Sequence, residues 1–222
     1  MNNTLMSSPL SSVLDGLFAE AEASTAGIRQ EMATLSPEER AAMMASKTEY
    51  RVFYERAKDF PLAVSRETGT LLYMLARSTG ARNIVEFGTS FGVSTLHLAA
   101  ALRDNGGGRL VTSEFESSKV ARARANFSAA GLADLVDLRE GDALETLAKG
   151  LPPAIDLVLL DGAKGLYPAI LELVEPHLRA GAFIVADNAD WSPEYLARVR
   201  SPAQGYLSVP FAEDVELSMR LG

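Results

Sequence analysis

The sequence VEFGTSFGVST, residues 85–95, decides the fold. In it a short apolar run is followed by two glycines and then by a helical stretch. Gly88 and Gly92 allow a tight turn, since glycine accepts φ values that other residues avoid. The following helix presents unpaired N–H groups and the positive end of its dipole, which suits a carboxylate or a phosphate. The spacing is G-x-x-x-G and not the G-x-G-x-x-G of dinucleotide folds, so pyrophosphate binding is disfavoured. A strand-to-helix turn also needs such glycines for structural reasons alone.

The same alternation of apolar runs and helical stretches extends along the chain from residue 83. It predicts right-handed crossovers and a parallel sheet with helices on both faces. The runs 207–211 and 214–221 are too close for a crossover, so they predict an antiparallel hairpin. We therefore expect an α/β sheet of seven strands, mostly parallel. The other expected strands are 83–88, 109–115, 136–142, 155–162 and 182–188, and helices are expected near 93–103, 118–130, 143–149, 166–179 and 193–200.

Helical patterns fill the first third of the chain. Apolar residues recur at helical spacing over residues 14–21, which predicts a helix with one apolar stripe. Ser36, followed by a proline and by Glu39, forms a capping box that predicts a helix running towards Lys58. A further helix is expected near residues 67–78, ending at a glycine.

Length and composition limit the class of protein. The chain has 222 residues and 47% apolar residues, so we expect one domain, with residues 1–66 as an N-terminal helical lid or dimerisation segment and 67–222 as the sheet core. A net charge of −8 argues against a nucleic-acid partner. The absence of cysteine excludes disulfides and thiolate zinc sites. Without a signal-peptide pattern or an apolar run of about 18 residues, we expect a soluble cytoplasmic protein with no membrane partner.

Acidic residues follow the second and third predicted strands, at the edge where open parallel sheets bind ligands. Glu114 can accept hydrogen bonds from both hydroxyls of a ribose. Asp142 either reaches an adenine amino group or caps the helix that begins at Ala143. Combined with the glycine turn, these residues predict a site for a nucleoside with a charged tail.

Oxygen ligands follow the fourth and fifth predicted strands, at Asp161 and at Asp187-Asn188. Two carboxylates and an amide carbonyl suit Mg²⁺ or Ca²⁺ and not zinc. Neighbouring strands lie about 4.8 Å apart, so these side chains can share one cation. Lys164 follows Asp161 by three residues, where burial beside a metal can lower its pKa and make it a general base. The alternative is a surface lysine and two acids that cap helices.

The runs VEFGTSFGVST, SEF, GDA, LLDGAKGLY and VADNADW together resemble the metal-dependent O-methyltransferases of the catechol and caffeoyl-CoA type, over roughly residues 60–222. The resemblance implies a Rossmann-like class I methyltransferase fold and S-adenosylmethionine as cofactor. It also implies a divalent metal on Asp161, Asp187 and Asn188, with Lys164 beside the acceptor hydroxyl. The expected cofactor contacts are Val64, Glu86, Gly88, Ser90, Ser94, Glu114, Phe115, Asp142, Ala143 and Asp161.

Other residues fit or depart from this pattern. Tyr167 and Trp191 stand where the motif carries aromatic residues. The small pair Gly162-Ala163 replaces bulkier or acidic residues that relatives often have, which leaves the acceptor pocket unspecified. Ser90-Phe91 replaces an aromatic residue followed by another residue. Asp190 is an extra acid beside the metal ligands, without an assigned role.

We expect methyl transfer to a hydroxyl of a small catechol-like or vicinal-diol acceptor. Lys164 and Asp161 are the expected catalytic residues, Mg²⁺ the expected cation with Ca²⁺ or Mn²⁺ as alternatives, and a homodimer the expected assembly. One rival is an enzyme of the same fold with an amine or a metal-free phenol as acceptor, and another is a module that binds the cofactor without catalysis. His97 and His177 belong to neither site pattern, so we expect both to be structural.

Overall fold

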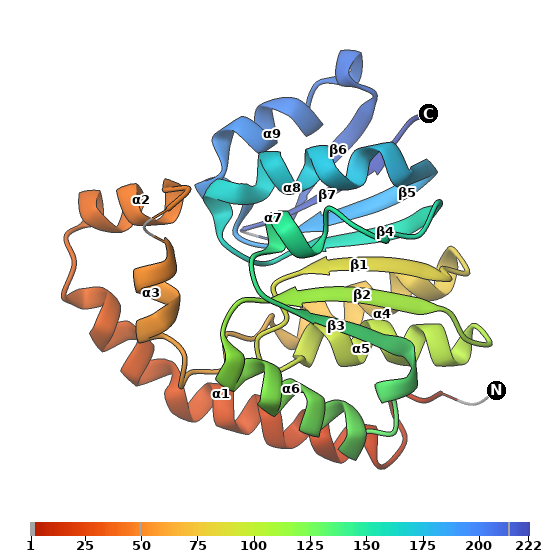
Figure 1. Ribbon diagram of the computed structural model, residues 1–222, viewed down its shortest axis with the longest axis horizontal. Helices are drawn as coiled ribbons and strands as arrows, with labels where there is room; N and C mark the ends of the chain where they lie inside the picture. The colour runs from red at the N-terminus through yellow and green to blue at the C-terminus, as the bar shows by residue number, and fades with distance from the viewer. Residues whose placement is uncertain (1–2, 49, 213) are drawn as a thin grey trace.

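The chain forms one mixed sheet flanked by helices in a computed structural model that describes residues 3–48, 50–212 and 214–222 (Figure 1). Within these residues the sheet has seven strands in the order β3-β2-β1-β4-β5-β7-β6. The pairs β5–β7 and β6–β7 are antiparallel and the other pairs are parallel. The predicted fold class and C-terminal hairpin are therefore confirmed. The strands are β1 (Asn83–Phe87), β2 (Arg109–Glu114), β3 (Val136–Glu140), β4 (Ile155–Leu160), β5 (Leu178–Ala186), β6 (Tyr206–Phe211) and β7 (Val215–Arg220).

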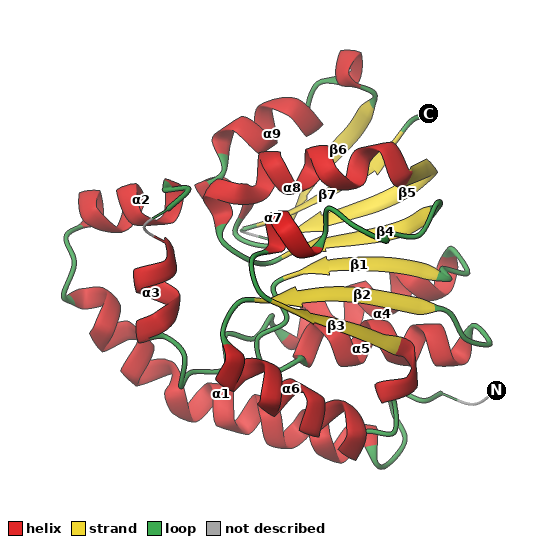
Figure 2. Cartoon of the chain, in the orientation of Figure 1, coloured by secondary structure: helices red, strands yellow, loops and turns green. Residues whose placement is uncertain are grey.

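Helices cover both faces of the sheet, as Figure 2 shows. Successive strand residues point to opposite faces, so Ile84 and Leu110 join one apolar core while Val85 and Val111 join another. Burial on both faces explains why the central strand β4 is almost entirely apolar. The first core lies against α1 (Leu10–Ala33), α4 (Arg66–Ser78), α5 (Val93–Asp104) and α6 (Ser117–Ala129), and the second against α7 (Ala143–Thr146), α8 (Tyr167–Val174) and α9 (Pro193–Val199).

The strand order reverses between β1 and β4, which places a ligand-binding crevice at their carboxyl ends. Backbone hydrogen bonds continue past the strands there. The Asp161 N–H donates to the Phe87 carbonyl at 2.8 Å, and the Asp187 N–H donates to the Leu160 carbonyl at 2.9 Å. The residues after β1, β4 and β5 are therefore held in register with the sheet.

The N-terminal helices α2 (Pro37–Ala45) and α3 (Tyr50–Arg56) lie beyond the carboxyl ends of the strands (Figure 1). The capping box at Ser36 is confirmed, because the Ser36 hydroxyl accepts from the Glu39 N–H and the Glu39 carboxylate accepts from the Ser36 N–H. The prediction of one helix towards Lys58 is wrong. The first helix ends at Ala45, because the backbone at Ser46 is extended, and a second helix starts at Tyr50.

Other boundaries differ by a few residues. The helix predicted over 166–179 ends at Val174, and β5 begins at Leu178 instead of residue 182. The register between β4 and β5 shifts in this stretch, where Gly181 has a φ of +76°. Among the described residues, no helix is long and apolar enough to cross a membrane. The 3₁₀ turns are η1 (Ala133–Leu135), η2 (Lys164–Leu166), η3 (Glu175–His177), η4 (Ala189–Trp191) and η5 (Pro202–Gln204).

Candidate active site

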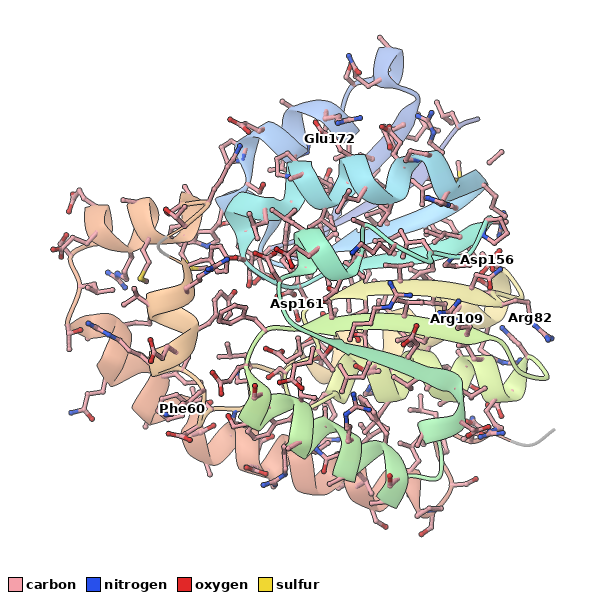
Figure 3. All side chains as sticks on the ribbon, in the orientation of Figure 1. Phe60, Arg82, Arg109, Asp156, Asp161 and Glu172 are labelled. Atoms are coloured by element: carbon pink, nitrogen blue, oxygen red, sulfur yellow. The ribbon has the colours of Figure 1, made fainter. Side chains whose placement is uncertain are left out.

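The side chains predicted to carry chemistry gather at the carboxyl end of the parallel strands. Figure 3 shows Asp161 at the end of the sheet that faces α2 and α3, and Asp156 at the opposite end. Asp156 accepts hydrogen bonds from the N–H groups of Arg82 and Asn83 at 2.8 and 2.9 Å and pairs with Arg179. The two acids at the ends of β4 therefore differ in role, and Asp156 ties the far end of the sheet together.

The turn after β1 is as tight as its glycines predict. Gly88 has a φ of +101°, and a Cβ atom there would collide with the carbonyl oxygen of Asp161. Gly92 has a φ of +91°, and its Cβ would collide with the ring of Phe127. Glycine at these positions lets the end of β1 lie against the end of β4 and lets α5 begin over α6.

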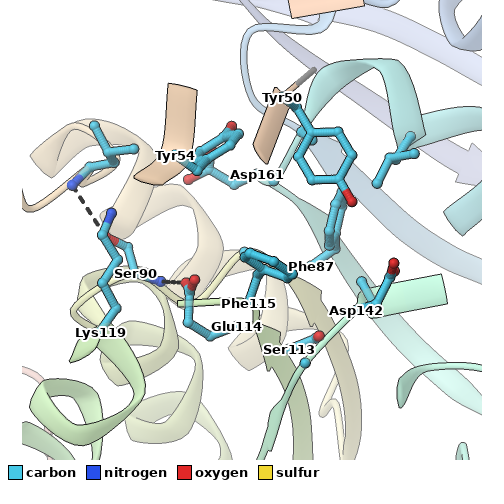
Figure 4. A pocket seen from close by; sticks show the side chains of 17 residues that line it. Tyr50, Tyr54, Phe87, Ser90, Ser113, Glu114, Phe115, Lys119, Asp142 and Asp161 are labelled. Atoms are coloured by element: carbon cyan, nitrogen blue, oxygen red, sulfur yellow. Dashed lines mark hydrogen bonds between the residues drawn. The ribbon is translucent and has the colours of Figure 1, made fainter. Parts of the chain in front are cut away.

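Glu114 faces the same loop (Figure 4). Its carboxylate accepts a hydrogen bond from the Ser90 N–H at 2.7 Å and another from the Glu116 N–H at 2.9 Å. The Ser90 hydroxyl in turn accepts from the Leu62 N–H at 3.2 Å. These bonds fix the Glu114 carboxylate, which retains acceptor capacity for a ligand hydroxyl because a carboxylate has about four lone-pair sites.

Glu86 and Ser94 lie beneath this loop. The Glu86 side chain is fully buried, and its carboxylate accepts hydroxyl hydrogen bonds of 2.6 Å each from Ser94, Thr95 and Thr112. Burial raises the pKa of Glu86 to about 7, although these three hydroxyls oppose the rise. Neither Glu86 nor Ser94 lines a cavity here, so their predicted cofactor contacts stay predictions.

A first cavity of about 60 Å³ lies over the ends of β1, β2 and β3. It brings together most of the residues predicted to contact the cofactor. Aromatic residues from α3 form its roof. Its lining includes Tyr50, Tyr54, Leu62, Gly88, Ser90, Glu114, Phe115, Lys119, Asp142, Ala143 and Asp161.

Asp142 takes the capping role that its position allowed. Its carboxylate accepts from the Leu144 N–H at 2.9 Å at the start of α7. The other carboxylate oxygen pairs with the guanidinium of Arg51 at 2.8 Å. Arg51 also lies over the ring of Phe115, 5.3 Å from its centroid. This contact ties α3 to the rim of the first cavity.

A second cavity of about 680 Å³ lies beside the first, and the two share Tyr54, Leu62 and Asp161. Val64 lines only the second. One wall consists of residues of the N-terminal segment and the opposite wall of the ends of β4 and β5. Its lining includes Phe18, Glu22, Met44, Val64, Arg66, Lys164, Asp187, Asn188, Ala212 and Asp214.

The predicted metal ligands meet at the boundary of the two cavities. Burial and the neighbouring carboxylate of Asp161 raise the pKa of Asp187 to about 8. The Asn188 amide donates from Nδ2 to Asp214 at 2.8 Å, which leaves its Oδ1 as the acceptor atom. Among the described residues, no three His, Cys, Asp or Glu side chains cluster closely enough to hold a metal by themselves. The predicted set instead combines two carboxylates and one amide.

Lys164 is buried and bound to Asp161. Its ammonium donates to Asp161 Oδ1 at 3.0 Å and lies 5.4 Å from the centroid of the Tyr167 ring. Burial by itself would lower the pKa of Lys164, but Tyr167 and the carboxylates of Asp161 and Asp187 raise it well above its ordinary value. A lowered pKa is expected for an amine beside a metal and stays a prediction; among the protein groups alone the nearby negative charges raise it.

Tyr167 holds the ligand-bearing strand ends together. Its fully buried hydroxyl lies 2.8 Å from both the Leu160 carbonyl oxygen, at the end of β4, and the Asp187 carbonyl oxygen, after β5. The second expected aromatic residue, Trp191, is 37% exposed and lines neither cavity. Of the two expected aromatic residues, Tyr167 therefore contacts the site and Trp191 does not.

Backbone strain concentrates at the site. Ser90, Asn188 and Ala212 are the non-glycine residues with positive φ in the described chain, at 49°, 48° and 58°. Ser90 lines the first cavity and the other two line the second. Such conformations cost about 1–3 kcal/mol each and persist where surrounding contacts impose them, often at functional sites.

Sequence patterns missed several residues of the site. Asp214 follows a hairpin turn, and only the antiparallel return of β7 brings it to Asn188. Arg51 and Lys119 are single cations in ordinary helices, so spacing gave no signal for them. His97 is buried in α5 with Nδ1 2.8 Å from the Val93 carbonyl, and neither it nor His177 lines a described cavity.

Known proteins share this architecture. The chain is similar to the O-methyltransferase TomG of Streptomyces achromogenes in complex with S-adenosylmethionine, with a TM-score of 0.65 and 28% identity over 91% of this chain and 99% of TomG. It is also similar to a Bacillus cereus O-methyltransferase in complex with S-adenosylhomocysteine, with a TM-score of 0.63 and 26% identity over 90% of this chain and 99% of the other. These likenesses confirm the predicted Rossmann-like class I methyltransferase fold.

Comparison of sequences also identifies O-methyltransferases as relatives of the chain. The chain is 37% identical over 131 residues to a catechol O-methyltransferase of Niastella koreensis and 38% identical over 127 residues to one of Mycobacterium tuberculosis. These segments are 57% of this chain in both cases and span only 58% and 57% of the two relatives. The family model described as O-methyltransferase matches residues 38–220, which is most of the sequence. The chain therefore belongs to the O-methyltransferase family.

Proposed function

We propose that this protein transfers the methyl group of S-adenosylmethionine to a hydroxyl of a small catechol-like or vicinal-diol acceptor, assisted by a divalent cation. The observation that carries the proposal is the meeting of the two cavities at Asp161. One cavity has the features of a nucleoside site, and the other contains Asp187, Asn188 and Lys164. A methyl donor in the first and an acceptor in the second would meet beside Lys164.

The first cavity suits the adenosyl group. The carboxylate of Glu114 is available to the ribose hydroxyls, and Phe115 and Ala143 supply apolar surface for the base. Asp142 already accepts from the Leu144 N–H and Arg51, so a base amino group would compete with Arg51 for it. The cofactor complexes of TomG and the Bacillus cereus protein support the choice of ligand.

The acid cluster suits a divalent cation. Asp161 and Asp187 are neighbouring carboxylates, and the ammonium of Lys164 pairs with Asp161, which leaves an excess of negative charge. A cation on Asp161, Asp187 and the Asn188 carbonyl would offset this excess of negative charge, and hard oxygen donors are those that Mg²⁺ prefers, with Ca²⁺ and Mn²⁺ as alternatives. A cation held by these residues would supply Lewis-acid chemistry and would lower the pKa of an acceptor hydroxyl.

The residues of the chain have distinct tasks in this proposal. Asp161 orients Lys164 through their 3.0 Å ion pair, and Tyr167 fixes the strand ends that carry Asp161 and Asp187. Lys164 accepts the proton of the acceptor hydroxyl once its own ammonium has lost a proton. The acceptor oxygen then forms a C–O bond while the C–S bond of the donor breaks, and the donor leaves as a neutral thioether.

Residues 1–66 serve as a lid over this site. The first cavity, at about 60 Å³, is far smaller than the roughly 300–1,000 Å³ of typical ligand pockets. Its roof is α3, held by the pair of Arg51 and Asp142. Movement of α3 away from the strand ends would admit the donor, and its return would exclude water.

The acceptor class follows from the relatives, and the assembly from the exposed surface. The names of the two catechol O-methyltransferases support a catechol. An amine or a metal-free phenol remains the rival acceptor, and turnover that persists in EDTA would favour it. A homodimer and a cytoplasmic location stay predictions. The exposed apolar side chains of Leu207, Val209 and Phe211 on the outer strand β6 are a candidate contact surface.

Magnesium titration of an acid variant tests the proposal. Mg²⁺ should raise the melting temperature of the wild type, and EDTA should abolish its turnover with a catechol panel. Asp187→Asn should lose both effects while still binding S-adenosylhomocysteine. Asp190→Asn is the matched control, since Asp190 is an exposed neighbour outside both described cavities. Full turnover of the wild type in EDTA would show that the metal assignment is wrong.

A further inference from the structure

Lys119 is a buried cation without a partner in the described parts of the chain. It lies in the first turn of α6, is only 2% exposed, and lines the first cavity. Its ammonium makes no hydrogen bond or ion pair with any described residue, and the ring of Phe91 lies 5.9 Å from it. Burial lowers the pKa of Lys119, although Glu114 and Glu116 oppose this. A charge buried in this way is costly unless a partner compensates it.

The side chain points into the cavity beside the glycine loop. Figure 4 shows Lys119 rising next to Ser90, on the side of Glu114 away from Asp142. If Glu114 binds the ribose, Lys119 therefore lies away from the base. The ammonium of Lys119, which has no partner among the described residues, makes this corner of the cavity attractive to an anion.

We propose that Lys119 binds the α-carboxylate of the amino-acid tail of the methyl donor. The inference rests on the proposed function, which supplies S-adenosylmethionine as the ligand of this cavity. The carboxylate is the only anionic group of that ligand, and a charge-assisted hydrogen bond to it would compensate the buried ammonium. The short Ser90 side chain, in place of the aromatic residue expected there, leaves Lys119 access to the tail.

Two ligands that differ only in the carboxylate test the assignment. Titration calorimetry should compare S-adenosylmethionine with decarboxylated S-adenosylmethionine on the wild type, on Lys119→Met and on Lys149→Met. Lys119→Met should weaken S-adenosylmethionine binding by about 10–100-fold, the usual effect of losing a hydrogen bond to a charged group. It should change the affinity for the decarboxylated ligand by less than about threefold, and the exposed Lys149 variant should match the wild type.

Three other outcomes would contradict the Lys119 assignment or the proposed function. An equal loss for both ligands in Lys119→Met would overturn the assignment, because the lysine would then support the cavity and not the carboxylate. Lys119→Arg keeps the charge and should still prefer the ligand with the carboxylate, so loss of that preference would also overturn it. Failure of the wild type to bind either ligand would instead refute the proposed function, and the Lys119 assignment with it.

Discussion

Lys164 has a position that suits a general base and a pKa that opposes this role. It lines the second cavity beside Asp161, where an acceptor hydroxyl would bind, but the carboxylates around it raise its pKa well above the ordinary value. Its proton-accepting form is therefore a minority at neutral pH. If Lys164 is the base, turnover should rise with pH, because the fraction of neutral amine grows about tenfold per pH unit below its pKa.

Substitution of Lys164 separates a base from a fixed positive charge. Lys164→Ala should lower kcat by about 10²–10⁴ with little change in cofactor affinity, and high pH should partly rescue it by ionising the acceptor directly. Lys164→Arg should be nearly as damaging, since a guanidinium stays protonated. The measurement is a pH–rate profile of all three forms. Near wild-type kcat in the arginine variant across neutral pH would mean that Lys164 acts only as a cation.

At the scale of elements, helix α2 rests on the loop that carries Lys164. Gly165 lies against the C-terminal end of α2, where a Cβ atom would lie only 2.5 Å from the Ala45 carbonyl oxygen and 2.8 Å from that of Ser46. Helix α2 and the loop that carries Lys164 therefore touch backbone to backbone. Displacement of α2 would in consequence disturb Lys164 directly.

Gly165→Ala should separate these two elements. We expect a loss of about 1–3 kcal/mol in the free energy of unfolding, the usual cost of overpacking, and faster hydrogen exchange over residues 37–56. Gly16→Ala is the matched control, because Gly16 is exposed in α1 and has open space around it. Unchanged exchange in the Gly165 variant would show that α2 does not depend on this contact.

The elements also show what local sequence could predict. Strand and helix alternation predicted a mostly parallel sheet with helices on both faces, because each crossover needs its own apolar run and amphipathic stretch. The break at Ser46 had no local signal, since neither proline nor glycine follows it before α3. Packing of α2 against Gly165 accompanies this break, and a contact across more than 100 residues leaves no mark on local periodicity.

For the molecule as a whole, the candidate site was predictable to the extent that it follows strand ends. Glu114, Asp161 and Asp187 each end a parallel strand, so topology alone brings them to one edge. Asp142 and Lys164 also lie at this edge, where they pair with Arg51 and Asp161. Those pairings depend on side-chain packing and could not be derived from spacing.

The stability of the molecule should depend on pH through Glu86. The pKa of this carboxyl is about 7 in the folded protein and 4.5 ordinarily, so between these pH values the folded state holds a proton that the unfolded chain has released. This contribution to stability is complete below about pH 4.5 and is lost as pH rises through 7, at no more than about 1.4 kcal/mol per pH unit.

Urea unfolding of the wild type and Glu86→Gln at pH 5, 6, 7 and 8 measures this effect. The glutamine does not titrate, so the wild type should lose stability relative to the variant from pH 5 to 7, with little further change by pH 8. A constant difference across the series would mean that Glu86 is ionised throughout and that its three hydroxyl donors outweigh burial.

The order of strands has a consequence for synthesis on the ribosome. The strand β7 lies between β5 and β6, although it follows both in the sequence. A nascent chain therefore presents one side of β5 as an open, apolar edge until the hairpin has emerged and inserted. Such an edge can pair with another unfinished chain. Slow translation of the segment between residues 186 and 215 should therefore promote aggregation, and a chaperone that covers β5 should prevent it.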